Sequence, residues 1–219
     1  MRSAFGAVAV LVIWGFGADN VNFDAVKPGT APPNWTFLSN RPADRARWEV
    51  RFDPSAPSRG NVLEKDGGGM AEADYPLAVF DKVICHDGDL SVKFRIDGGS
   101  RIRTAGLVWR FVDLNNYYLL HFSVDQRNIA LLRVLNGKIE QIPVTSDKLV
   151  LKTIAHDIGV GQWYVTKVSF RGDHIRAFFG NRVLFDASDE GLMAAGKTGV
   201  WTRGRTMASF DDFRIDRKN

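Results

Sequence analysis

Residues 105–144 read AGLVWRFVDLNNYYLLHFSVDQRNIALLRVLNGKIEQIPV, and this stretch decides the fold. Apolar side chains recur at alternate positions in short segments, which is typical of β-strands with one buried face. Polar turns separate the segments, and the last turn is Asn136-Gly137, the dipeptide that favours a two-residue hairpin. The stretch therefore predicts antiparallel strands at Ala105–Val112, Tyr117–Val124, Asn128–Leu135 and Lys138–Val144.

The same alternation extends to both sides, and no long segment keeps the 3.6-residue apolar period of a helix. Further strands are predicted at Trp48–Phe52, Leu77–Ile84, Asp89–Ile96, Trp163–Arg171, His174–Phe179, Arg182–Phe185, Gly199–Thr202 and Thr206–Ile215. About a dozen short strands joined by tight turns indicate an all-β protein, either a two-sheet sandwich or a barrel.

Composition and charge exclude several classes of protein. The chain has 219 residues, 45% apolar and 25% charged, which excludes a disordered chain. Lys and Arg number 29 against 25 Asp and Glu, but they are scattered singly, so we expect no nucleic-acid partner. Cys85 is the only cysteine, which excludes an intrachain disulfide and a Cys-x-x-Cys motif.

The amino terminus resembles a secretory signal peptide over residues 1–18. Arg2 is followed by an uncharged run from Ser3 to Ala18, too short to span a membrane. We expect cleavage after Ala18 and a secreted or periplasmic protein with no membrane span; an uncleaved anchor and a buried amino-terminal strand are the alternatives. Residues 19–219 contain no linker or repeat and are expected to form one domain.

Strand register decides which side chains share a face. If Val112 lies beside Tyr117 and Val124 beside Asn128, one apolar face becomes the core. Its predicted members are Leu107, Trp109, Phe111, Tyr118, Leu120, Phe122, Leu132 and Val134. The opposite face then carries Arg110, His121 and Arg133, and the Asn136-Gly137 turn sets Glu140 beside Arg133.

Two further turns, at Arg171-Gly172-Asp173-His174 and Phe179-Gly180-Asn181-Arg182, predict hairpins in the carboxy-terminal third. The turn at Arg171-Gly172-Asp173-His174 sets Phe170 beside Ile175 and Val168 beside Ala177 on a core face.

A set of motifs carries a family resemblance between about Trp48 and Ile215. The motifs are Gly106-Leu-Val-Trp-Arg110, Asn115-Asn-Tyr-Tyr118, Asn136-Gly-Lys138, Gln162-Trp163, Gly196-Lys-Thr-Gly-Val-Trp-Thr202 and Phe210-Asp-Asp-Phe213. They resemble the bacterial exported proteins with a concanavalin A-like, laminarinase-like jelly roll, and more narrowly the 3-keto-disaccharide hydrolases, also described as 3-keto-glucoside lyases and hydratases. The resemblance implies a two-sheet antiparallel jelly-roll sandwich and a carbohydrate partner, an oligosaccharide or an oxidised glycoside.

The acidic motif of laminarinases is missing. That motif places carboxylates at alternating positions, as in Glu-x-Asp-x-x-Glu, so that nucleophile and acid/base share a face. Glu64-Lys65-Asp66 is the nearest start, but Gly67–Gly69 follows. A retaining glucanase mechanism is therefore disfavoured, and a non-catalytic carbohydrate-binding or surface-recognition sandwich is the alternative to an enzyme.

The reaction implied by the resemblance needs a base, an enolate stabiliser and an acid. A ketone at C3 of a sugar acidifies the C2 hydrogen, which a base removes. His121 could be the base or acid, Arg110 and Arg133 could stabilise the enolate, and Glu140 could orient Arg133 or act as the acid. A catalytic divalent metal could replace the arginines. The alternative is a cross-strand ion pair between Arg133 and Glu140 and a solvated His121.

Two other groups of residues are candidates. Asp211 and Asp212 could hold a structural calcium, because paired carboxylates suit a hard cation, although ordinary hydrogen bonding near the strand end is the alternative. Four tryptophans could stack on sugars or pack in the core; they are Trp35, Trp48, Trp163 and Trp201.

Overall fold

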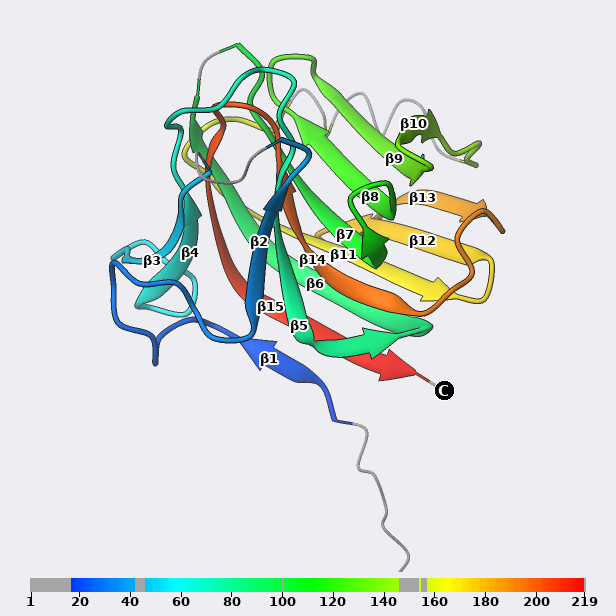
Figure 1. Ribbon diagram of the computed structural model, residues 1–219, viewed down its shortest axis with the longest axis horizontal. Coiled ribbons are helices and arrows are strands. Elements are labelled where there is room, and N and C mark those ends of the chain that lie inside the picture. Colours follow the sequence, from blue (N-terminus) through cyan, green and yellow to red (C-terminus); the bar gives the residue numbers. More distant parts are fainter. Residues whose placement is uncertain (1–16, 42–45, 100, 146–153, 155–156, 219) are drawn as a thin grey trace, which may run out of the picture.

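The computed structural model describes residues 17–41, 46–99, 101–145, 154 and 157–218, which form an antiparallel all-β structure (Figure 1). Its strands are β1 (Asp19–Val21), β2 (Trp35–Ser39), β3 (Trp48–Phe52), β4 (Asn61–Lys65), β5 (Pro76–Cys85), β6 (Asp87–Gly98), β7 (Thr104–Asp113), β8 (Asn116–Ser123), β9 (Asn128–Leu135), β10 (Lys138–Gln141), β11 (Trp163–Arg171), β12 (His174–Phe179), β13 (Arg182–Ser188), β14 (Gly196–Thr202) and β15 (Met207–Lys218).

These strands form two sheets that lie as two layers, which confirms the predicted sandwich (Figure 1). Sheet A has the order β13-β12-β11-β6-β15-β4-β3, and β1 pairs with the carboxy-terminal half of β15. Sheet B has the order β10-β9-β8-β7-β14-β5-β2. Each sheet therefore joins strands that are far apart in the chain.

The core fills the space between the sheets. Leu107, Trp109, Tyr118, Leu120 and Phe122 are all fully buried there, as predicted. Burying one large apolar side chain contributes about 1.5–3 kcal/mol, so this face of β7 and β8 is a major source of stability.

The predicted register is wrong near the end of β7 because the strand contains a β-bulge. Asp113 lies opposite Asn116 at the turn, as expected, but Trp109 lies opposite Tyr118 and Leu107 opposite Leu120. Arg110 adopts a left-handed φ of 47° at this irregularity. Arg110 consequently points to the inter-sheet side beside Trp109, whereas Phe111 joins the outer face of sheet B.

The predicted register is also wrong for β9, by one residue. Asn128 pairs with Ser123 and not with Val124, because the loop contains four residues, Val124 to Arg127. A one-residue shift turns every side chain of a strand to the other face. Leu131 therefore lies in the core, while Leu132 and Val134 lie on the outer face.

The hairpin predictions that rest on short turns are confirmed. Asn136 and Gly137 have φ values of 51° and 78°, as a type I′ turn requires, and Glu140 pairs with Arg133. In sheet A, Phe170 lies beside Ile175 as predicted.

Three strands were not predicted: β1, β2 and β4. They are short, and β2 and β4 supply Trp35 and Leu63 to the core. The predicted signal peptide falls almost entirely on residues 1–16, which lie outside the described residues. Within the described part of the chain, no helix has the length and apolar character needed to cross a membrane.

Candidate functional site

The outer face of sheet B carries a second apolar cluster, separate from the inter-sheet core. It comprises Leu77, Val79, Val108, Phe111, Tyr117, Leu119, Val134 and Trp201, with Leu38, Tyr75, Leu114 and Leu132 packed against it. Four of its members, Tyr75, Leu119, Leu132 and Trp201, line the candidate site.

One row of paired residues across sheet B places His121 next to Trp201. His121 on β8 pairs with Gly106 on β7, and Gly106 pairs in turn with Trp201 on β14. Because Gly106 has no side chain, the His121 ring contacts the Trp201 ring edge to face, at 5.7 Å between centroids. A Cβ on Gly106 would lie 2.7 Å from Leu119 Cδ1 and from the Leu120 carbonyl oxygen. Glycine is therefore required at this position.

A groove of about 200 Å³ opens over this row. We call it the His121 groove; it is lined by Tyr75, Leu119, His121, Gln126, Asn128, Ala130, Leu132, Ile139, Gln141, Trp201 and Arg203. Its walls combine aromatic rings with three primary amides, and these provide apolar contact area and hydrogen-bond donors and acceptors.

Tyr75, Trp201 and Arg203 form a stack along one wall of the groove. The Tyr75 and Trp201 rings are 5.7 Å apart and inclined by only 24°. The Arg203 guanidinium lies 5.8 Å from the centre of the Tyr75 ring, and its Nε donates to the Glu72 carbonyl oxygen at 2.9 Å. The cation–π contact and this hydrogen bond fix the guanidinium at the groove edge.

His121 is a neutral imidazole in an apolar setting. The residue is only 6% exposed, and its Nδ1 has no hydrogen-bond partner among the described residues. Burial, and to a lesser degree the positive charge of Arg203, lowers the pKa of His121 to about 4. At neutral pH His121 can therefore accept a proton or a hydrogen bond, which a charged imidazolium could not.

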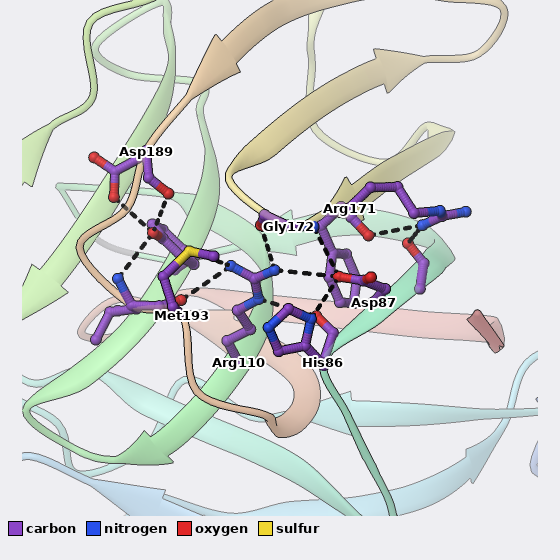
Figure 2. A network of polar contacts seen from close by, with 11 residues as sticks. His86, Asp87, Arg110, Arg171, Gly172, Asp189 and Met193 are labelled. Carbon is purple, nitrogen blue, oxygen red and sulfur yellow. Dashed lines mark hydrogen bonds and ion pairs between the residues drawn. The ribbon is translucent and has the colours of Figure 1, made fainter. Parts of the chain in front are cut away.

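The expectation that Arg110, His121, Arg133 and Glu140 share a ligand face is wrong. His121 lies on the outer face of sheet B, whereas the bulge and the one-residue shift turn Arg110 and Arg133 to the inter-sheet side. The two arginines belong to what we call the rim network, which comprises Asp87, Arg110, Tyr118, Arg133 and Asp189. Figure 2 shows Asp87, Arg110 and Asp189 of this network.

Every N–H of Arg110 already has an acceptor. Its Nε donates to the His86 carbonyl oxygen at 3.1 Å, and one terminal nitrogen donates to the Leu192 carbonyl oxygen at 3.0 Å and to Met193 Sδ at 3.8 Å. The other donates to the Gly172 carbonyl oxygen at 2.5 Å and to Asp87 at 3.4 Å (Figure 2). A fully buried arginine with five occupied donors has none left for an enolate.

Arg133 bridges two carboxylates on either side. It donates to Asp189 at 2.7 Å and to Glu140 at 2.6 Å, and Asp189 also accepts from the Tyr118 hydroxyl at 2.6 Å. These hydrogen bonds more than offset the effect of burial and hold the pKa of the Asp189 carboxyl below its usual value. The predicted Arg133–Glu140 ion pair therefore exists within the β9–β10 hairpin, and the Arg133–Asp189 ion pair fastens that hairpin to the loop after β13.

Asp211 and Asp212 have separate partners. Asp211 is buried and accepts from the Ser58 backbone N–H at 2.8 Å, whereas Asp212 pairs with Lys93 at 2.6 Å. Burial raises the pKa of Asp211. In the described ranges no three His, Cys, Asp or Glu side chains gather as a metal site would require, and the calcium site stays a prediction.

Of the four candidate tryptophans, Trp35, Trp48 and Trp201 are buried and Trp163 is partly exposed. Trp35 and Trp48 are buried among core aromatic rings, and Trp163 lies under the Arg95 guanidinium at 4.9 Å from the ring centre. Trp201 is the one of the four that lines the His121 groove.

Tyr75 and Arg203 were missed from the sequence because both lie just outside strands. They reach His121 only through the order β8-β7-β14-β5, which joins segments distant in the chain. A glycine inside an otherwise regular strand pattern, as at Gly106, is the signal for a close approach that could have pointed to this row.

Comparisons with known proteins identify the fold as concanavalin A-like. The carbohydrate-binding module CBM66 from Bacillus subtilis superposes with a TM-score of 0.60 at 17% identity, over 83% of this chain and 94% of the module. The Bacillus licheniformis β-glucanase superposes with a TM-score of 0.53 at 11% identity, over 93% of this chain and 99% of the glucanase.

A third similar structure is the GH43 protein BlXynB from Bacillus licheniformis. It superposes with a TM-score of 0.55 at 14% identity, over 90% of this chain and 39% of that protein. No family model and no curated protein matches the sequence. At these identities the likeness shows the fold alone.

Proposed function

We propose that this chain is a carbohydrate-active protein that binds a glycan in the His121 groove. The observation that carries the proposal is the lining of this groove, which combines the stacked Tyr75 and Trp201 rings with the neutral His121 and three primary amides.

The groove lining suits a sugar. Aromatic side chains give apolar contact to the C–H faces of pyranose rings, and Gln126, Asn128 and Gln141 can hydrogen-bond hydroxyl groups in either direction. Similarity in fold to a carbohydrate-binding module and to a β-glucanase supports the same proposal.

A glycan-array screen followed by calorimetry tests it. We expect the wild-type chain to bind an oligosaccharide, and Tyr75→Ala and His121→Gln to weaken that binding by roughly tenfold or more. His174→Gln is the matched control, because His174 is exposed on sheet A. Unchanged affinity in both groove variants would place the binding site elsewhere.

A second candidate function is the elimination or hydration of 3-keto-glycosides, as the family resemblance implies. The neutral imidazole of His121 and the cation of Arg203 in one groove favour it. His121 would remove the C2 proton, the C1=C2 bond would form as the glycosidic C1–O bond breaks, and a proton would pass to the leaving oxygen. Arg203 would stabilise the negative charge on the ketone oxygen.

Turnover of a 3-keto-glucoside separates the two candidates. The elimination hypothesis predicts release of the alcohol by the wild-type chain and loss of release in His121→Gln. Binding of an oligosaccharide without any release of alcohol from 3-keto-glucosides would support the binding function and contradict the elimination hypothesis.

We also propose that the protein is exported with cleavage near Ala18. The uncharged run after Arg2 supports this, and β1 begins at Asp19, directly after the proposed cleavage position. Mass spectrometry of the protein from its native host should find a mature chain beginning near Asp19. An intact Met1 in the cytoplasmic fraction would contradict export.

A further inference from the structure

The charge of the His121 groove is unbalanced. Arg203 carries the only full charge among its lining residues, since His121 is neutral and the lining contains no Asp or Glu. Within the described residues, the groove therefore presents a net positive charge surrounded by amides and aromatic rings.

Arg203 also differs from the arginines that support the fold. Arg110 and Arg133 are ion-paired with carboxylates, and so are Arg95 and Arg103 in the two sheets. No described carboxylate lies within ion-pair distance of Arg203, whose contacts with the described residues use only Nε and one face of the guanidinium. Within this part of the chain, its two terminal nitrogens are left for a ligand.

The geometry of Arg203 favours a planar anion. Nε is fixed to the Glu72 carbonyl oxygen and one guanidinium face is covered by Tyr75, so rotation of the side chain is restricted. A guanidinium held in this way presents its terminal N–H groups in the fork that matches a carboxylate. His121 cannot compete for that anion as a cation, because burial keeps it uncharged at neutral pH.

We propose that the ligand of the His121 groove is an acidic sugar, one whose carboxylate, as in a hexuronic acid, is received by Arg203. This inference rests on the proposed carbohydrate-binding function and specifies the chemical class of the glycan. The Tyr75 and Trp201 wall contacts the sugar ring, and the amides bind its hydroxyl groups. Arg203 makes the charge of the sugar a condition of tight binding.

Pairs of oligosaccharides that differ only at the carboxyl group test the inference. The probes are oligogalacturonides, oligoglucuronides and alginate fragments, each compared by calorimetry with its carboxyl-reduced, neutral counterpart. We expect the wild-type chain to bind an acidic member roughly tenfold or more tightly than its neutral counterpart. The preference should weaken as salt increases, because an exposed part of the ion pair is screened.

Two variants test whether Arg203 causes the preference for acidic sugars. Arg203→Gln should bind the acidic and neutral members of each pair with equal affinity. Arg182→Gln is the control, because Arg182 is exposed at the edge of sheet A, and it should keep the full preference.

Three other outcomes would each contradict a different claim. Equal affinity of the wild-type chain for both members of every pair, with loss of binding in Tyr75→Ala, would reject the acidic ligand and leave the carbohydrate function standing. An acid preference that survives in Arg203→Gln would reject Arg203 as its receptor. Absence of binding to every acidic and neutral glycan would reject the proposed function together with this inference.

Discussion

The rim network and the His121 groove both bury polar side chains among apolar residues, but they satisfy them differently. In the rim network each N–H of Arg110 has an acceptor, and Asp189 accepts from Tyr118 and Arg133, while Nε of Arg133 has no partner among the described residues. In the groove Nδ1 of His121 has no partner, and Arg203 has no carboxylate among the described residues.

This difference teaches where to look for function in a fold of this kind. A nearly saturated polar cluster stabilises the loops that it connects, and its charged residues have few hydrogen-bonding groups left for a ligand. An unsaturated cluster lowers the stability of the free protein, and a ligand that completes it gains the missing hydrogen bonds on binding. Arginine at a strand end is therefore not by itself a sign of a site.

Removing Arg110 should have the largest effect on stability. Arg110→Met leaves Asp87 and the carbonyl groups of His86, Gly172 and Leu192 without their donor, and we expect the free energy of unfolding to fall by about 3–5 kcal/mol. Urea denaturation measures this loss. Arg182→Met should change the free energy of unfolding by less than about 0.5 kcal/mol. A loss below about 1 kcal/mol for Arg110→Met would mean that water replaces the guanidinium and that the rim is wet.

Acid should lower the stability of the protein through the buried His121. The pKa of His121 is about 4 in the folded state and 6.5 in the reference state, so the unfolded chain binds more protons between these values. Stability should therefore fall as pH decreases from 6.5 to 4, by up to about 3 kcal/mol, and this contribution should stay constant below pH 4.

The variant His121→Leu isolates that contribution from the titration of the acidic residues. Denaturation curves at several pH values should show that the difference in unfolding free energy between wild type and variant grows over the stated pH range. A constant difference would contradict a buried, neutral His121.

Filling the gap over Gly106 should disturb the groove. The Cβ of Gly106→Ala would overlap Leu119 and the Leu120 carbonyl group, and we expect a loss of about 1–3 kcal/mol in unfolding free energy. Glycan binding should weaken as well, because His121 and Trp201 flank this residue. The control is Ala105→Gly in the same strand, which tests the effect of backbone flexibility alone. Gly161→Ala would be a poor control, because Gly161 has a positive φ that disfavours alanine.

At neutral pH the same His121→Leu variant should be slightly more stable than wild type. It removes a buried nitrogen without a partner, and we expect a gain of about 1 kcal/mol in unfolding free energy together with loss of glycan binding. If instead stability falls and binding persists, the imidazole packs as a structural residue.

The smallest effect is expected at Glu140. Its carboxylate is largely exposed where it meets Arg133, so Glu140→Gln should lower the unfolding free energy by less than about 1 kcal/mol. Asp189→Asn should have a larger effect, because Asp189 is nearly buried and also accepts from Tyr118. Equal effects of the two changes would show that the rim network is no more saturated than an ordinary surface ion pair.

The sequence predicted the fold well wherever local chemistry sets the geometry. Asn136-Gly137 fixed its hairpin, and the turn before His174 fixed the pairing of Phe170 with Ile175. The predicted register was wrong at Arg110. A bulge residue with a positive φ need not be glycine, so the alternation of apolar and polar residues gave no sign of the bulge. The predicted register was also wrong at β9, because apolar residues occupy both faces of that strand, so the pattern fits either register.

The candidate site was harder to predict than the fold for a physical reason. Its residues come from β8, β14 and the loops beside β5 and β14, and only the strand order of sheet B brings them together. His121 was identified from its position on the outer face of β8. Arg110 was assigned to the same face by a register that the bulge breaks, and Arg203 carried no local signal.

The strand order also determines when this protein can fold during its synthesis. β15 lies between β6 and β4, and β14 lies between β7 and β5, so the last two strands in chain order join the two halves of each sheet. A ribosome-bound chain that lacks them has open strand edges and an exposed core. Neither sheet can therefore be completed before β14 and β15 have been made.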